Sequence, residues 1–144
     1  MTTLPDGVYA ASLTPQHDDL SINHERLVAH VRWLLENGCD GIVLFGTTGE
    51  ANSFTVAERI EALDAVVDAG IPAYLLLVGT GCCAVPDSVT LTRHAVEHGV
   101  GGVLMLPPFY YKNVPDDGVL LPLIRSFSRL GRQVCASTCI IFPS

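Results

Sequence analysis

The chain has 144 residues, of which 49% are hydrophobic and 16% charged, and it carries a formal net charge of -7 with a pI near 5.0. This composition excludes a disordered chain and favours one globular unit with a sizeable core. Because the eight basic residues are scattered singly, the charge argues against a nucleic-acid or anionic-membrane surface. A small anionic ligand would need local donors.

Strand-like and helix-like segments alternate along the chain. A strand is predicted over residues 8–13 and a helix over residues 23–36, where apolar side chains recur at helical spacing. Residues 41–45 are apolar at successive positions, as in a parallel strand buried on both faces. The next helix opens with the capping-box pattern Thr55-x-x-Glu58. Its predicted buried stripe consists of Ile60, Leu63, Val66 and Val67.

The alternation continues in the second half. We predict a strand over residues 73–78, a helix from Pro86 to Gly99, and a strand over residues 102–106. A further helix is predicted over residues 119–130 and a strand from Val134. This order implies right-handed βαβ units and a parallel sheet. Either an open doubly wound sheet or part of an eightfold β/α barrel fits the pattern.

Targeting and redox features are sparse. No apolar stretch reaches the roughly 18 residues of a membrane span, and residues 1–6 lack a signal-peptide pattern, so a cytoplasmic location is expected. The five cysteines are odd in number and lack CxxC spacing, which predicts neither disulfides nor a zinc site. His94 and His98 are four residues apart and could chelate a metal, but we expect them on a solvated helix face and predict no metal site.

A Gly-Thr-Thr-Gly turn follows the second predicted strand. Gly46 and Gly49 allow a tight turn, and the hydroxyl and N–H groups of Thr47 and Thr48 can converge on a carboxylate or phosphate. Alternatively, these hydroxyls only cap the following segment. An unrelated phosphate-binding α/β domain is the weaker alternative, because no Walker-type lysine or G-x-G-x-x-G pattern accompanies the turn.

The pattern Gly41-x4-Gly46-Thr47-Thr48-Gly49-Glu50-Ala51, with Glu58 further on, resembles the signature of the dihydrodipicolinate synthase / N-acetylneuraminate lyase family. Further similar segments follow in order to about residue 130, including residues 79–81 and 107–111. The resemblance implies a (β/α)8 TIM barrel, which takes about 250 residues and eight strands. We therefore expect residues 1–135 to be an N-terminal half-barrel of about four βα units with parallel strands.

The resemblance also implies Schiff-base aldolase or lyase chemistry on pyruvate or another short 2-oxo acid, without a metal or organic cofactor. A lysine forms an iminium that serves as an electron sink, while fixed donors hold the carboxylate. Carried over by motif, Gly46, Thr47 and Thr48 bind the substrate, and Thr47 and Tyr110 relay protons, with Tyr111 as the alternative to Tyr110. The full-length form is expected to be a homo-oligomer, because many relatives lend this tyrosine to a neighbouring subunit.

The resemblance has two departures. Lys112 is the only lysine of the chain and follows the fourth predicted strand, so the sixth-strand Schiff-base lysine has no counterpart and the chain is expected to be catalytically incomplete. The alternative is a non-catalytic fragment or pseudoenzyme that retains carboxylate binding or subunit pairing. Cys82 and Cys83 stand where relatives often carry polar residues, and no cation is near them in sequence. Glu50 is expected to order the loop rather than act as a base.

The resemblance ends near residue 136. Residues 136–144 are expected to form a non-family tail, and we hypothesise a frameshift near Cys135. A genuine alternative terminus or a deliberate truncation is the competing explanation.

Overall fold

The computed structural model describes residues 6–106, Tyr110 and Pro115. The predictions for residues 119–130, Val134, Tyr111, Lys112 and the segment 136–144 lie outside the described residues. The described elements are β1 (Tyr9–Ala11), α1 (His24–Glu36), β2 (Gly41–Leu44), η1 (Ala51–Ser53), α2 (Val56–Asp68), η2 (Ala73–Leu75), β3 (Leu76–Gly79), α3 (Val85–Glu97) and β4 (Gly102–Leu104). Within the described part of the chain, no helix is long and apolar enough to cross a bilayer.

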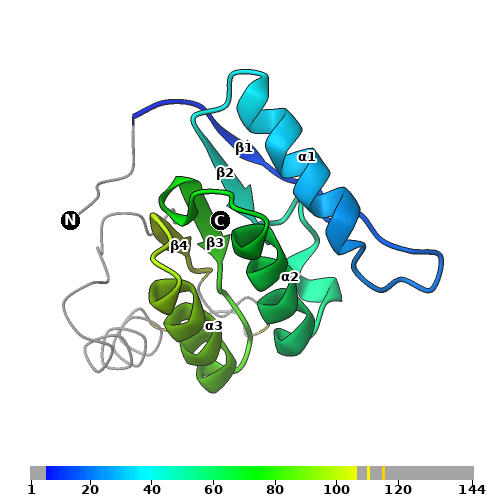
Figure 1. Cartoon of the computed structure of the whole chain (residues 1–144). Helices are drawn as coiled ribbons and strands as arrows, with labels where there is room; N and C mark the ends of the chain where they lie inside the picture. The colour runs from blue at the N-terminus through cyan, green and yellow to red at the C-terminus, as the bar shows by residue number, and fades with distance from the viewer. Residues whose placement is uncertain (1–5, 107–109, 111–114, 116–144) are drawn as a thin grey trace.

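The four strands form one parallel sheet in the order β1-β2-β3-β4. Figure 1 shows α1, α2 and α3 packed on the same face of this sheet. A doubly wound sheet reverses its strand order and places helices on both faces, whereas successive right-handed βαβ units that never reverse keep every helix on one face. The structure therefore resolves the two predicted architectures in favour of four consecutive strands of a barrel.

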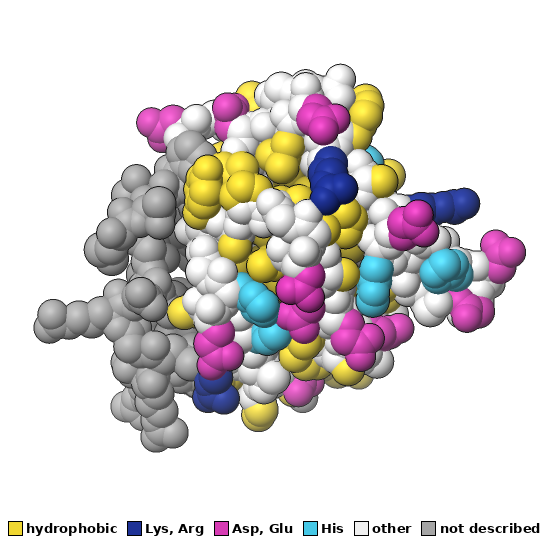
Figure 2. Space-filling view, in the orientation of Figure 1, with side chains coloured by type: hydrophobic (Ala, Val, Ile, Leu, Met, Phe, Trp, Pro, Cys, Tyr) yellow, Lys and Arg dark blue, Asp and Glu magenta, His cyan; other side chains and the backbone are white. Residues whose placement is uncertain are grey.

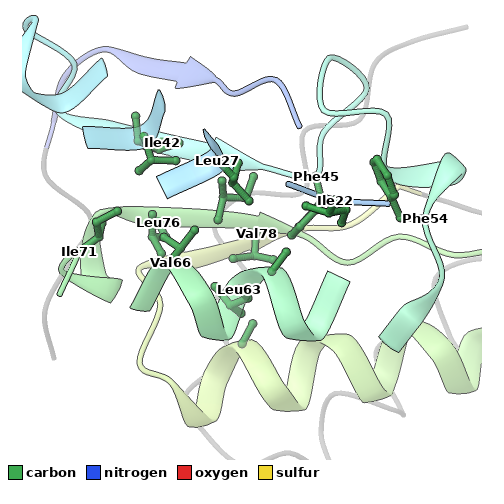
Figure 3. Packing of buried hydrophobic residues seen from close by; sticks show 14 residues of the cluster. Ile22, Leu27, Ile42, Phe45, Phe54, Leu63, Val66, Ile71, Leu76 and Val78 are labelled. Carbon is green, nitrogen blue, oxygen red and sulfur yellow. The ribbon is translucent and has the colours of Figure 1, made fainter. Parts of the chain in front are cut away.

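The layer between the sheet and the helices holds the core. Ile42, Leu44, Leu76 and Val78 alternate along β2 and β3 with residues of the opposite face, and all four are buried. They pack against side chains of the helices, as Figure 3 shows for Leu63 and Val66 of α2. The opposite sheet face carries the layer Ala11, Val43, Leu77 and Gly102, which are register partners across the four strands.

Helix α2 begins with the predicted capping box. The Thr55 hydroxyl accepts from the Glu58 N–H at 3.3 Å, and the Glu58 carboxylate accepts from the Thr55 N–H at 2.8 Å. The predicted burial of Leu63 and Val66 is confirmed, whereas Ile60 and Val67 are only half-buried. Arg59 and Ala62 occupy the remaining buried positions of this stripe.

Thr55→Ala is expected to lower the free energy of unfolding by about 1 kcal/mol at neutral pH, because α2 loses its capping oxygen. Hydrogen bonds from the Thr55 hydroxyl and backbone N–H lower the pKa of Glu58. A pKa lowered by folding stabilises the protein above the unfolded-state pKa, and this contribution disappears as the pH falls through the folded-state pKa. Urea unfolding at several pH values should therefore show the difference between wild type and variant shrinking in acid.

The matched control for this cap is Thr90→Ala, at an exposed position of α3 where, within the described residues, the hydroxyl donates only to the Pro86 carbonyl. It should leave the acid dependence unchanged. A Thr55→Ala difference that stays constant or grows in acid would contradict the capping assignment.

The third predicted strand began too early. Residues 73–75 form the 3-10 turn η2, and the strand starts at Leu76. Pro72 supplies a carbonyl to the Leu75 N–H, while the Gly101 N–H donates to the carbonyls of Ala73 and Leu76. These bonds hold the segment in a turn where an apolar run predicted extended backbone. The fourth strand likewise ends at Leu104, two residues before its predicted end.

Candidate ligand-binding site at the carboxyl ends of the strands

The Gly-Thr-Thr-Gly turn starts with an unusual backbone conformation. Phe45 directly follows β2, is buried, and has a φ of 55°. Positive φ in a bulky residue is costly and persists only where the surroundings enforce it. Inside the turn, the Glu50 N–H donates to the Thr47 carbonyl at 3.1 Å, and the Ala51 N–H donates to the Gly46 carbonyl at 3.4 Å.

Neighbouring strands hold this turn on both sides. The Thr14 hydroxyl, from the loop after β1, donates to the Gly49 carbonyl at 2.7 Å. On the other side, Gly79 ends β3 so close to the turn that a Cβ there would lie 1.9 Å from the Phe45 carbonyl oxygen. The glycine is therefore required by a backbone–backbone approach, and the position of the turn is determined by contacts with β1 and β3 regions rather than by local preference.

Thr47 and Thr48 are exposed, and their donors are uncommitted. In the described part of the chain neither hydroxyl makes a hydrogen bond, and neither backbone N–H donates to another backbone group. The following η1 helix has Glu50 at its N-cap with no side-chain cap bond. The alternative that these hydroxyls only cap the next segment is thus wrong, and the turn presents donors suited to an anion.

The turn opens into a cavity of about 620 Å³ on the sheet face away from the helices. This volume suits a small organic molecule. The residues that line it include Gly46, Thr47, Thr48 and Glu50, Gly79 at the end of β3, Gly81 in the loop after it, and the apolar Val43, Leu104 and Leu106. The structure therefore brings together the predicted substrate-binding residues Gly46, Thr47 and Thr48. Within the described residues, Glu50 makes its hydrogen bonds through its backbone.

Two tyrosines differ in their relation to this cavity. Tyr110, the predicted relay residue, is 76% exposed and is not among the described residues that line the cavity. Tyr9 of β1 does line it. Burial, and then the nearby carboxylates of Asp40 and Asp6, raise the pKa of Tyr9, so its phenol remains protonated at neutral pH.

Arg59 lies behind the turn and was missed by the sequence analysis. Its side chain is only 3% exposed, and its guanidinium donates to the Gly79 carbonyl at 2.6 Å. The Cζ atom lies 5.7 Å from the centre of the Phe45 ring. Burial lowers the pKa of Arg59, yet a guanidinium stays charged at neutral pH. Arg59 therefore places a buried positive charge beside the turn, although it is not among the described residues that line the cavity.

The same guanidinium lies 3.3 Å from the Cys82 sulfur, so a cation is close to this thiol in space although none is near it in sequence. The Cys82 N–H donates to the Ser88 hydroxyl at 2.9 Å, which ties the loop after β3 to α3. Among the described residues, the one group with the spacing of metal ligands is Asp64, His94 and His98, and it does not line this cavity. The expectation that His94 and His98 lie on a solvated helix face was wrong, because both are half-buried against Asp64 of α2.

The fold and site define a class: an α/β-barrel protein with a glycine-bracketed pair of threonines at the carboxyl end of its second strand. Residues 4–118 match the profile of the Dihydrodipicolinate synthetase family, and the chain belongs to that family. An uncharacterised DapA-like lyase of Chloroflexus aurantiacus is 38% identical over 117 residues, which cover 81% of this chain and 39% of that protein.

Solved structures similar to this chain include the following two. Dihydrodipicolinate synthase from Agrobacterium tumefaciens matches with a TM-score of 0.83 and 36% identity, over 88% of this chain and 44% of that one. YagE, a prophage protein of E. coli K12 solved in complex with pyruvate, matches with a TM-score of 0.69 and 26% identity, over 86% of this chain and 40% of that one. The chain spans about two fifths of the length of these relatives.

Proposed function

We propose that this chain carries the carboxylate-binding half of a Schiff-base aldolase or lyase site, in which Gly46, Thr47 and Thr48 hold the carboxylate of pyruvate or another short 2-oxo acid. The observation that carries the proposal is the pair of hydroxyls and backbone N–H groups, uncommitted within the described residues, at the edge of a cavity of about 620 Å³. The likeness to a relative solved with pyruvate supports the same ligand class.

The role of the turn is to position the acid. Fixed donors to the carboxylate hold the keto carbon in the orientation that the reaction needs. Binding energy lowers the reaction barrier through this orientation. Arg59 acts through its hydrogen bond to Gly79 and its contact with Phe45, and so serves as a positioning residue. Thr47 and Tyr110 are proposed to relay protons in a homo-oligomeric, cytoplasmic full-length form.

The iminium step needs a lysine that this sequence does not supply at the expected place. Lys112 is the only lysine, and it follows β4 in the chain next to Tyr111 and near Asp116 and Asp117. A nucleophilic lysine needs desolvation or cationic neighbours to lower its pKa. We therefore propose that Lys112 does not form an imine, and that residues 1–144 contribute binding of the 2-oxo acid rather than the iminium step.

Thr48→Ala is expected to weaken pyruvate binding by about tenfold or more, because one hydrogen bond to a charged group contributes about 1.5–3 kcal/mol. Isothermal titration calorimetry with sodium pyruvate measures the change. Thr90→Ala, at an exposed site on α3 outside the cavity, is the matched control and should bind as wild type does.

Equal affinity of wild type and Thr48→Ala would exclude the turn as the carboxylate site. Borohydride added in the presence of pyruvate provides the second measurement. No mass increase is expected, and a covalent adduct would overturn the binding-only part of the proposal while leaving the carboxylate site intact.

A further inference from the structure

Three side chains with metal-binding chemistry converge between α2 and α3. The Nε2 atoms of His94 and His98 lie 2.7 and 2.8 Å from the same oxygen of Asp64, Oδ1. All three ligand atoms lie within 4.8 Å of one another. Figure 2 shows histidine and acidic side chains side by side on the molecular surface over these two helices.

The local structure explains this convergence. His94 lies in the last turn of α3 and His98 is its C-cap, so the two are four residues apart and share one helix face. Their rings meet edge to face, with centroids 4.6 Å apart and planes at 72°. The two rings are therefore not stacked face to face, and both Nε2 atoms reach the same Asp64 oxygen.

We propose that Asp64, His94 and His98 form a binding site for a divalent cation of the Zn²⁺ class. Imidazole and carboxylate are ligands that Zn²⁺, Ni²⁺ and Co²⁺ accept, and three protein ligands with water as the fourth complete a tetrahedron. Ligand atoms of such a site lie about 3.3 Å apart when the metal bonds are about 2.0 Å. The nitrogen–oxygen distances here need to lengthen by only about half an ångström to reach that value.

The side chains are open enough to admit an ion. They are 22% exposed for His94, 27% for His98 and 38% for Asp64. The cluster therefore combines access from solvent with partial burial, which limits competition from water. Its residues come from two helices, so a bound ion would join α2 to α3 across their packing contact.

The cluster and the proposed 2-oxo acid site lie near opposite ends of the strands. Asp64, His94 and His98 belong to the C-terminal halves of their helices. These helices run back against parallel strands, so the cluster is near the amino ends of the strands, whereas Thr47 and Thr48 are at the carboxyl ends. At that end of a barrel, residues contribute to stability rather than chemistry. The ion thus stabilises the packing of α2 against α3.

Titration of the whole chain with Zn²⁺ alone, followed by calorimetry, tests the site. One ion per chain is expected to bind, and Asp64→Asn or His98→Gln is expected to weaken binding by about tenfold or more, since even residues that only support ligands contribute that much. His30→Gln is the matched control, because it removes a histidine of α1 outside the cluster and should leave Zn²⁺ affinity unchanged.

Co²⁺ provides an independent readout. Visible d–d absorption without a thiolate charge-transfer band is expected for nitrogen and oxygen ligands, and Asp64→Asn should abolish it. Asp64→Asn preserves the shape of a partly exposed side chain, and far-ultraviolet circular dichroism checks that it folds. Absence of Zn²⁺ binding, unchanged affinity of the folded Asp64→Asn chain, or a thiolate band that places the ion at Cys82 and Cys83 would each overturn the proposal.

Discussion

Gly79→Ala is expected to destabilise the chain by about 3 kcal/mol or more and to abolish 2-oxo acid binding. Overpacking a tight site typically costs about 1–3 kcal/mol, and here the added Cβ would lie 1.9 Å from the Phe45 carbonyl oxygen and 2.7 Å from its carbonyl carbon. Both contacts are with backbone atoms, so no side-chain rotation relieves them. Either β3 or the turn after β2 must move.

Gly46→Ala, a glycine substitution in the turn that Gly79 approaches, is the matched control. A Cβ at Gly46 meets only Val43 Cγ1, at an ordinary 3.6 Å. Urea unfolding should therefore show a near-normal midpoint for Gly46→Ala and a strongly lowered one for Gly79→Ala. Similar midpoints for the two variants would contradict the close approach of β3 to the turn.

Arg59→Met is expected to lower the free energy of unfolding by about 2 kcal/mol and to weaken pyruvate binding. The substitution keeps an unbranched apolar stem but leaves the buried Gly79 carbonyl without its charged donor, and an unpaired buried acceptor costs about 1–3 kcal/mol. It also removes the positive charge beside the Phe45 ring. Denaturation and calorimetry with pyruvate measure the two effects.

Unchanged stability of Arg59→Met is also physically reasonable, so the measurement distinguishes between two real possibilities. Replacing a buried charge by an apolar residue can be neutral or stabilising when the charge is poorly paired, and the Arg59 Nε has no partner among the described residues. Unchanged stability and unchanged affinity would remove Arg59 from the positioning of the turn. Arg93→Met, at an exposed position of α3, controls for the loss of one positive charge.

Local patterns predicted most of the fold because they are physical consequences of local structure. The capping box of Thr55 and Glu58 and the burial of Leu63 and Val66 are confirmed. The parallel, barrel-type sheet predicted from the family resemblance is also confirmed. The predicted start of β3 at residue 73 was wrong, because the turn at residues 73–75 depends on hydrogen bonds from Gly101, which is distant in sequence.

The sequence predicted only part of the site, because some of its contacts join residues that are distant in the chain. Gly46, Thr47 and Thr48 carry a recognisable motif and lie together at the cavity. Arg59 carries no motif, although its spacing with Ala62, Leu63 and Val66 is that of a buried helix face and could have indicated burial. The meeting of Asp64 with His94 and His98 depends on how α2 packs against α3, which no local pattern encodes.

The agreement between chain order and strand order bears on how this protein reaches its folded state. Each strand pairs with the one that precedes it, as when Leu76 of β3 joins Ile42 of β2. Paired strands are therefore separated by only one helix and its loops, and contacts of smaller sequence separation favour faster folding than pairings between more distant strands. During synthesis, each new βα unit can dock on units already released from the ribosome, without waiting for a later segment to arrive.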